Sequence, residues 1–313
     1  MDLEKALRII LSGKSTYSSI KNSLDFLHHD FSSKSGVYAG DLTFEKGMDT
    51  ENGWIVSPVM AAHCLIDIER TTRFLRAIHK AIEYYLKNHQ QIRILYAGCG
   101  PYATLLTPFT TLYTPEQLRF TFLEINEESV GAVKKLHRAY DLNSFIDDVM
   151  LADATNPDLK FGNPFHIIVS ETMQMALRKE CQVPITRNLV KFLTPDGTFI
   201  PKRISLDVYL TGSLDPLNPR DQKKEYVGTA YELDFRNVPE PNHKTVLTVP
   251  PSELVHLQLF TEIYLYGEEK LTLRQSGLTQ PLTLDRFKNK RPSAVQFTYM
   301  EGLRPELVFK YIV

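Results

Sequence analysis

Polar and hydrophobic positions follow three successive patterns along this chain of 313 residues. In the first, a short amphipathic stretch near the N-terminus precedes a run in which apolar residues recur at helical spacing from Leu65 to Tyr85. Ser57 and Pro58 supply a cap residue and a first-turn proline ahead of that run. The pattern predicts N-terminal helices and then one long helix that begins at Ser57 and packs one face on a sheet.

In the second pattern, short apolar runs alternate with helical or loop segments. These runs cover residues 92–97, 120–125, 149–151, 165–169 and 198–200. Strands that alternate with helices are typical of a parallel sheet with covered faces. We therefore expect an α/β domain with an open, parallel sheet that helices cover.

The third pattern begins after Pro201, where apolar positions alternate with a period of two over residues 204–210 and 257–265. Such alternation predicts a second domain of antiparallel strands, which is either a barrel or a sandwich. We expect three parts: an N-terminal helical segment (1–54), the sheet domain (55–200) and an antiparallel domain (201–313). Residues 213–243, which are rich in proline and charge, predict a long excursion that is either an oligomerisation arm or a plain loop.

Composition excludes several classes of protein. A hydrophobic content of 43% with 23% charged residues suits a soluble protein with a large core, and a net charge of -1 creates no field that would attract nucleic acid or an anionic membrane. The three cysteines have no metal-ligand or disulfide spacing, and no apolar run approaches the roughly 20 residues of a membrane span. We expect a cytoplasmic protein without a metal.

A glycine turn, Gly98-Cys99-Gly100, follows the first predicted strand. Glycine allows the backbone to approach a ligand closely because no Cβ intervenes. With Ala103 as a third small residue the spacing also satisfies the dinucleotide pattern, although a tight turn without a ligand is the alternative. The turn predicts a nucleotide-like cofactor.

Acidic residues end the next two predicted strands. Glu124 is placed to accept both hydroxyls of a ribose, or else to cap the following helix as a solvated acid. Asp153, followed by Ala154, is placed to accept a hydrogen bond from an adenine amino group, or else to form an Asx turn. Both acids belong to the same predicted edge of the sheet.

Two glutamates, Glu171 and Glu180, come directly behind the strand-like run 165–169. Ligands of open α/β sheets bind beyond the carboxyl ends of the strands, so the pair is placed to clamp one flat cation. The alternative is an exposed acidic loop that Arg178 and Lys179 neutralise.

These glutamates belong to a wider resemblance to the protein arginine methyltransferases, which covers roughly residues 55–212. Three groups carry it: Ser170-Glu171, Met173, Leu177 and Glu180 of the double-glutamate loop; Leu65, Asp67, Arg70 and Thr71 of a cofactor-binding helix; and Leu193, Pro195-Asp196-Gly197, Pro201, Arg203 and Leu206 of the interdomain junction. The resemblance implies a Rossmann-like methyltransferase sheet with N-terminal helices and a C-terminal antiparallel β-barrel-like domain. A homodimer is also expected from it.

The resemblance implies roles for individual residues as well. Glu171 and Glu180 would grip a substrate guanidinium, whose planar fork of donors matches carboxylates. The residues expected to hold S-adenosylmethionine are Arg70, Gly98, Gly100, Glu124, Asp153 and Ala154, with Arg70 at the methionine carboxylate. Arg70 as a surface helix charge is the competing interpretation. Catalysis would come mostly from orientation and electrostatics.

The chain departs from the family pattern at three places. Tyr96-Ala97 stands where an acid usually precedes the glycine turn, Tyr102 replaces the last glycine, and no Thr-His-Trp triplet occurs. Because that triplet lines the family's substrate channel, its absence favours a small guanidine, such as free arginine, over an arginine peptide. Two other functions remain open: a NAD-dependent oxidoreductase, and a non-catalytic interaction protein that keeps the methyltransferase fold.

Overall fold

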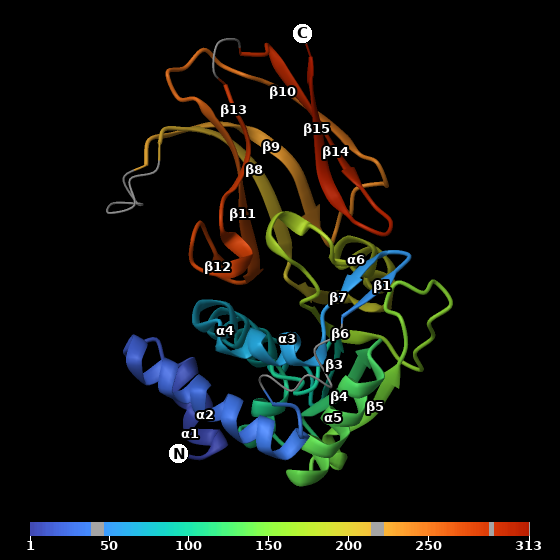
Figure 1. The fold of residues 1–313 in the computed structure, drawn as a ribbon. Coiled ribbons are helices and arrows are strands. Elements are labelled where there is room, and N and C mark those ends of the chain that lie inside the picture. Colours follow the sequence, from blue (N-terminus) through green and yellow to red (C-terminus); the bar gives the residue numbers. More distant parts are fainter. Residues whose placement is uncertain (39–46, 214–221, 288–290, 313) are drawn as a thin grey trace.

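The molecule has helices at one end, a parallel sheet in its middle and antiparallel strands at the other end (Figure 1). This computed structural model describes residues 1–38, 47–213, 222–287 and 291–312. Within these ranges no helix combines the length and the apolar character needed to cross a membrane. Nor do the described His, Cys, Asp and Glu side chains form a group of three or more that could hold a metal ion.

The N-terminal part contains the expected helices, α1 (Leu3–Leu11) and α2 (Tyr17–Ser35). Each begins at a side-chain cap, Asp2 for α1 and Thr16 for α2, which accepts a backbone N–H of the first turn. Their buried faces belong to the same apolar core as the helices of the sheet domain. A small hairpin of β1 (Met48–Thr50) and β2 (Gly53–Ile55) follows.

The long helix predicted from Ser57 is interrupted. The structure has α3 (Pro58–His63), a 3-10 turn (Cys64–Ile66) and then α4 (Ile68–Tyr85). Asp67 leaves the helical conformation with ψ 97° and caps α4, because its carboxylate accepts the N–H of Arg70 at 3.3 Å. The prediction of one continuous helix is therefore wrong, and the new start places Arg70 in a first helical turn.

The sheet of the central domain has five parallel strands, as predicted, with ends that differ by a few residues. They are β3 (Ile92–Ala97), β4 (Leu118–Glu124), β5 (Ile146–Leu151), β6 (Phe165–Ser170) and β7 (Leu193–Ile200). α5 (Glu127–Ala139) connects β4 to β5, and α6 (Gln182–Leu189) connects β6 to β7.

The strand order β5-β4-β3-β6-β7 reverses its direction between β3 and β6. Connections leave these two neighbouring strands on opposite sides, so a crevice opens beyond their carboxyl ends. All six positions of β6 are buried, and β3 is almost as buried. The sheet thus provides a rigid edge with an opening at its centre.

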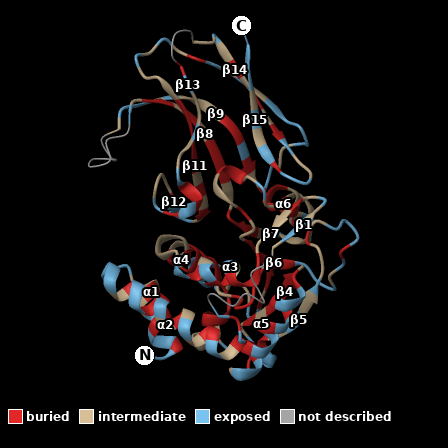
Figure 2. Ribbon diagram, in the orientation of Figure 1, coloured by how far each residue is buried: buried red, intermediate tan, exposed pale blue. Residues whose placement is uncertain are grey.

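The C-terminal part is antiparallel, which confirms the predicted fold class, and its described residues form two sheets. One contains β12 (Glu269–Leu271), β11 (His256–Tyr266), β8 (Arg203–Thr211) and β9 (Lys224–Asp234), with β13 (Leu282–Arg286) also paired to β11; the other contains β10 (Lys244–Thr248), β14 (Ala294–Met300) and β15 (Glu306–Ile312). Figure 2 shows buried positions along β8, β9 and β11, whereas β15 is mostly exposed.

The excursion predicted over residues 213–243 is only partly present. Residues 214–221 lie outside the described residues. Lys224–Asp234, however, forms β9 and pairs with β8 along its length, so this part is a sheet strand and not a loop or an arm. Its buried Ala230, Tyr231 and Leu233 explain why it stays in the sheet.

Candidate functional site

A cavity of about 440 Å³ lies at the carboxyl edge of the parallel sheet, where β3 and β6 are neighbours. Its wall includes every residue predicted from the sequence. These are Arg70, Gly98, Gly100, Glu124, Asp153, Ala154, Glu171 and Glu180. Residues separated by more than one hundred positions in the chain therefore face one space.

The glycine turn after β3 needs glycine at both positions. Gly98 has a φ of +69° and Gly100 a φ of +62°, in the left-handed region that other residues rarely adopt. A Cβ on Gly98 would also lie 2.3 Å from Cγ2 of Thr172, which follows Glu171. The turn and the glutamate loop thus touch each other.

Tyr102, which replaces the last glycine of the family pattern, is buried behind this turn. Its hydroxyl donates to the carbonyl of Val37 at 2.8 Å and lies 2.7 Å from Oγ of Ser32 in α2. Tyr102 therefore attaches α2 to the glycine turn.

Glu124 is buried at the end of β4, where it receives three backbone N–H groups. Oε2 accepts from Gly100 at 2.8 Å, and Oε1 accepts from Ile125 and Asn126 at 2.9 Å each. Burial raises the pKa of Glu124, and the three hydrogen bonds oppose that rise. The solvated capping interpretation is wrong, because the acid is buried and Asn126 caps α5 instead. A carboxylate offers about four acceptor positions, so Oε2 retains one for a ligand hydroxyl.

Asp153 has the turn role that the sequence left open. Its Oδ1 accepts from both the N–H and the hydroxyl of Thr155 at 2.8 Å. The carbonyl of the next residue, Ala154, accepts from Nδ2 of Asn188 in α6 at 2.8 Å. The Asx turn is confirmed, and a contact with adenine remains a prediction.

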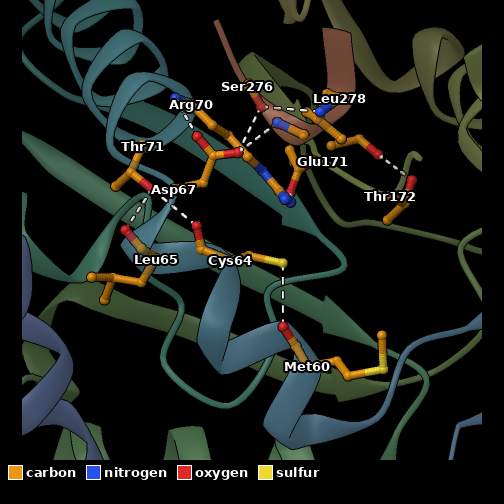
Figure 3. Close-up of polar contacts among 12 residues, drawn as sticks. Met60, Cys64, Leu65, Asp67, Arg70, Thr71, Glu171, Thr172, Ser276 and Leu278 are labelled. Carbon is orange, nitrogen blue, oxygen red and sulfur yellow. Dashed lines mark hydrogen bonds and ion pairs between the residues drawn. The ribbon is translucent and has the colours of Figure 1, made fainter. Parts of the chain in front are cut away.

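Arg70 forms an ion pair with Glu171 across the cavity wall, which Figure 3 shows in close-up. The two side chains are 14% and 8% exposed, so Arg70 is not a surface charge. Oε1 of Glu171 is buried and has no hydrogen-bond partner among the described residues. An unpaired buried oxygen is costly, so this atom is a strong acceptor for a donor brought by a ligand.

Glu180 differs from Glu171 in its electrostatics. Burial raises its pKa to about 7, while the charge of Arg70 and a hydrogen bond with the side chain of Gln174 act in the opposite direction. The acid therefore changes its charge near neutral pH. The two glutamates lie on one cavity wall but are not equivalent.

The loop between the glutamates has a strained backbone. Ala176, Leu177 and Lys179 have φ values of 59°, 52° and 69°, a conformation that is uncommon for residues with a Cβ. Such residues persist where the surrounding structure holds them in place, and they concentrate at functional sites.

Groups from outside the parallel sheet hold this loop. The C-terminal strands and their β14–β15 turn form three hydrogen bonds with its backbone. They join Ala176 N to Thr261 Oγ1 at 3.2 Å, Leu177 O to the Tyr299 hydroxyl at 2.8 Å, and Lys179 N to Pro305 O at 2.7 Å. From the other side, Trp54 N in β2 donates to Lys179 O at 2.6 Å.

The C-terminal domain also reaches the N-terminus of α4. Oδ2 of Asp67 accepts from Oγ of Ser276 at 2.7 Å and from N of Gly277 at 3.1 Å (Figure 3). Gly277 and Leu278 then line the cavity. Sequence reasoning missed this contact, although an aspartate three residues before Arg70 is a signal of a helix start.

Several wall residues were not predicted as site residues. Trp54, Arg178 and all three cysteines line the cavity. Burial raises the pKa of Cys99 well above its usual value and that of Cys181 to about 11, so neither is a thiolate near neutral pH.

No protein-family model and no curated protein matches the chain. The solved structures that are similar in fold include two arginine methyltransferase structures. A chain of the PRMT1 enzyme-prozyme heterotetrameric complex with AdoHcy from Trypanosoma brucei gives a TM-score of 0.52 at 14% identity and covers 80% of this chain and 96% of that one. Protein arginine methyltransferase 10 from Arabidopsis thaliana, in a uniquely open conformation, gives 0.52 at 12% identity and covers 74% and 84%. The chain thus has the fold of arginine methyltransferases.

Proposed function

We propose that this protein is an S-adenosylmethionine-dependent N-methyltransferase that transfers a methyl group to a guanidine nitrogen of a small, arginine-like molecule. One observation carries the proposal: a pair of glutamates lines the same cavity as a glycine turn and a buried strand-end acid, in a fold shared with arginine methyltransferases. The NAD-dependent alternative does not account for the glutamates.

The residues of the cavity fit the adenosyl cofactor. The cavity volume of about 440 Å³ lies within the range of roughly 300–1,000 Å³ that is typical of ligand pockets. Gly98 and Gly100 line the cavity, Glu124 retains an acceptor for a ribose hydroxyl, and Asp153 on the same wall would accept a hydrogen bond from an adenine amino group. Arg70 would bind the methionine carboxylate, partly in exchange for Glu171. When bound, the cofactor supplies a methyl group activated by a sulfonium.

The two glutamates would bind and orient the substrate. Oε1 of Glu171 has no partner in the described structure, and ionised Glu180 supplies a second negative charge. Together they would hold the guanidinium plane and direct one nitrogen at the methyl group. A carboxylate whose pKa lies near 7 is also suited to receive the proton that this nitrogen loses.

Other expectations remain part of the proposal. The domain boundaries stay at residues 54/55 and 200/201, and the cytoplasm stays the expected compartment. A homodimer stays an expectation, and the similar Trypanosoma chain belongs to an enzyme-prozyme heterotetramer. The contacts of a homodimer would come from the N-terminal helices or from residues 213–243.

The experiment that tests the function measures two properties. Calorimetry should detect tight S-adenosylhomocysteine binding and no NAD binding. Mass spectrometry should detect a labelled methyl group on free arginine after incubation with labelled S-adenosylmethionine and a panel of guanidines and arginine peptides. Absence of adenosyl-cofactor binding would identify an interaction protein, and NAD binding would identify an oxidoreductase.

A further inference from the structure

Arg178 is a cation on the cavity wall without a counter-charge in the described chain. Three cationic residues line the cavity: Arg70, Arg178 and Lys179. Arg70 pairs with Glu171, and Lys179 is exposed. Arg178 is half-buried, and within the four described ranges its guanidinium has no ion-pair or hydrogen-bond partner.

Arg178 does not neutralise the nearby Glu180. In an extended chain, residues two apart point to the same side, but Lys179 between them has a φ of 69° and breaks that alternation. In agreement, burial raises the pKa of Glu180 and the charge of Arg70, not that of Arg178, lowers it. The guanidinium of Arg178 is therefore available for a different anion.

An available guanidinium on a cavity wall is suited to bind a carboxylate. Its planar fork donates two parallel hydrogen bonds to the two oxygens, and charge makes each bond stronger than a neutral one. Two ligands of the proposed reaction can carry a carboxylate, the cofactor and the substrate. Arg70 lies beside the glycine turn and Glu171 and is assigned to the cofactor, which leaves Arg178 for the substrate.

The cavity wall near Arg178 suits the methylene groups that join the guanidinium and the carboxylate of a guanidino acid. The 3-10 turn Met175–Leu177 packs against the turn Gly277–Thr279 of the C-terminal domain. Met175 and Leu278 from these turns line the cavity and present apolar side chains. Methylene groups of a bound molecule would lie there without losing hydrogen bonds.

We infer that Arg178 binds the carboxylate of the substrate, and that the substrate class is a small guanidino acid such as free arginine. Its guanidinium would lie at Glu171 and Glu180, and its carboxylate must be free and not part of a peptide bond. This inference rests on the proposed function of the cavity. It adds a second recognition point at the far end of the substrate.

The test compares arginine with agmatine, which lacks the carboxylate, and with arginine amide, in which the carboxylate is neutral. For the wild type, kcat/KM should be about tenfold to a hundredfold higher for arginine than for either analogue. Arg178→Gln should lower kcat/KM for arginine by the same factor, mainly through KM, and leave agmatine unchanged. Arg178→Lys should restore part of the loss, because lysine keeps the charge without the fork.

Lys179→Gln is the matched control, since it removes one positive charge from the neighbouring exposed position. It should leave the arginine-to-agmatine ratio unchanged. If Arg178→Gln slows both substrates equally, or weakens S-adenosylhomocysteine binding while the ratio persists, the assignment is wrong. A wild type that prefers arginine amide or capped arginine also overturns it.

Calorimetry separates this inference from the proposed function. Arginine and agmatine are titrated into the wild type and Arg178→Gln with S-adenosylhomocysteine present, so no turnover is needed. Selective arginine binding that depends on Arg178, without methyl transfer, would reject the enzyme function and keep the carboxylate site. Equal binding of the two ligands, or binding of neither, would reject the site.

Discussion

The two sides of the cavity are held together by different parts of the molecule. On the proposed cofactor side, the carboxylate of Glu124 accepts the N–H groups of Gly100, Ile125 and Asn126, all at the edge of one sheet. On the substrate side, the loop of residues 171–181 is hydrogen-bonded to β2, β11, β14 and the β14–β15 turn.

The two sides of the cavity therefore depend on different parts of the structure. The glycine turn and Glu124 form when the parallel sheet forms, because their contacts lie within neighbouring strands and turns. Arg70 also depends on the contact between Asp67 and the turn at Ser276 and Gly277. The substrate loop, whose backbone is strained at Ala176, Leu177 and Lys179, needs the C-terminal domain in place. Changes in that domain should therefore affect methyl transfer more than cofactor affinity.

The largest effect should come from the glutamates themselves. Under the proposed function, Glu180→Gln removes a charge that would hold the guanidinium, so we expect kcat to fall by about 10²–10³. The affinity for S-adenosylhomocysteine should not change, because Glu180 belongs to the substrate side. Turnover assays with free arginine and calorimetry measure the two effects, and wild-type turnover would contradict the clamp.

Glu171→Gln should lower kcat to a similar extent but behave differently toward the cofactor. Glu171 pairs with Arg70, so its loss frees that arginine for the methionine carboxylate. S-adenosylhomocysteine should then bind more tightly than to the wild type. Weaker binding would mean that Arg70 needs Glu171 to hold its position.

Gly98→Ala tests the point where the two sides touch. The new methyl group would require a left-handed alanine and would meet Thr172 at 2.3 Å. We expect the free energy of unfolding to fall by about 2–3 kcal/mol and cofactor affinity to fall at least tenfold. Gly131→Ala is the control, since Gly131 lies in α5 and a Cβ added there would have nothing within 4 Å. It should stabilise the protein by about 0.5–1 kcal/mol, which thermal unfolding can measure.

The pH dependence should also differ between the two sides. Glu180 has its pKa raised by burial from 4.5 to about 7, and only the ionised form attracts a guanidinium. kcat/KM should therefore rise as pH increases to about 7 and level off above it, with a change of about tenfold per unit well below that value. A profile without an ionisation between pH 6 and 8 would contradict this role.

The free energy of unfolding should change with pH in the opposite direction, because of the same carboxyl group of Glu180. A carboxyl whose pKa is raised in the folded protein favours the protonated form, so its contribution to stability is greatest below pH 4.5 and is lost as pH rises through about 7. Glu180→Gln should reduce this loss. Urea unfolding of both proteins at pH 5 and pH 8 measures it.

The smallest effect should come from Tyr299→Phe. This change leaves the carbonyl of Leu177 without its buried partner, at a cost of about 1–2 kcal/mol. We expect kcat to fall about fivefold, with unchanged S-adenosylhomocysteine affinity. Tyr226→Phe is the control, since Tyr226 is exposed and its hydroxyl lies in hydrogen-bond contact with Thr229, which is outside the glutamate loop. If Tyr299→Phe lowered S-adenosylhomocysteine affinity by the same factor as kcat, the two sides of the cavity would not be independent.

Much of the cofactor side could be predicted because its signals are local. A strand that ends in Gly98-Cys99-Gly100 and a strand that ends in Glu124 place these residues at one edge whenever the strands are parallel. The prediction of one continuous helix from Ser57 was wrong because two local preferences compete at Asp67. Helical periodicity places Asp67 in a helix interior, but its side chain captures a backbone N–H and starts a new helix.

The sequence by itself determined the parallel sheet, the antiparallel C-terminal part and eight of the residues that line the cavity, since periodicity and strand ends specify which side chains share an edge. Only the tertiary structure decided that Arg70 pairs with Glu171, that Tyr299 holds the glutamate loop and that Arg178 faces the cavity without a described partner. The reason is physical: these contacts join segments that no local pattern relates, and they form only when the separate layers pack together.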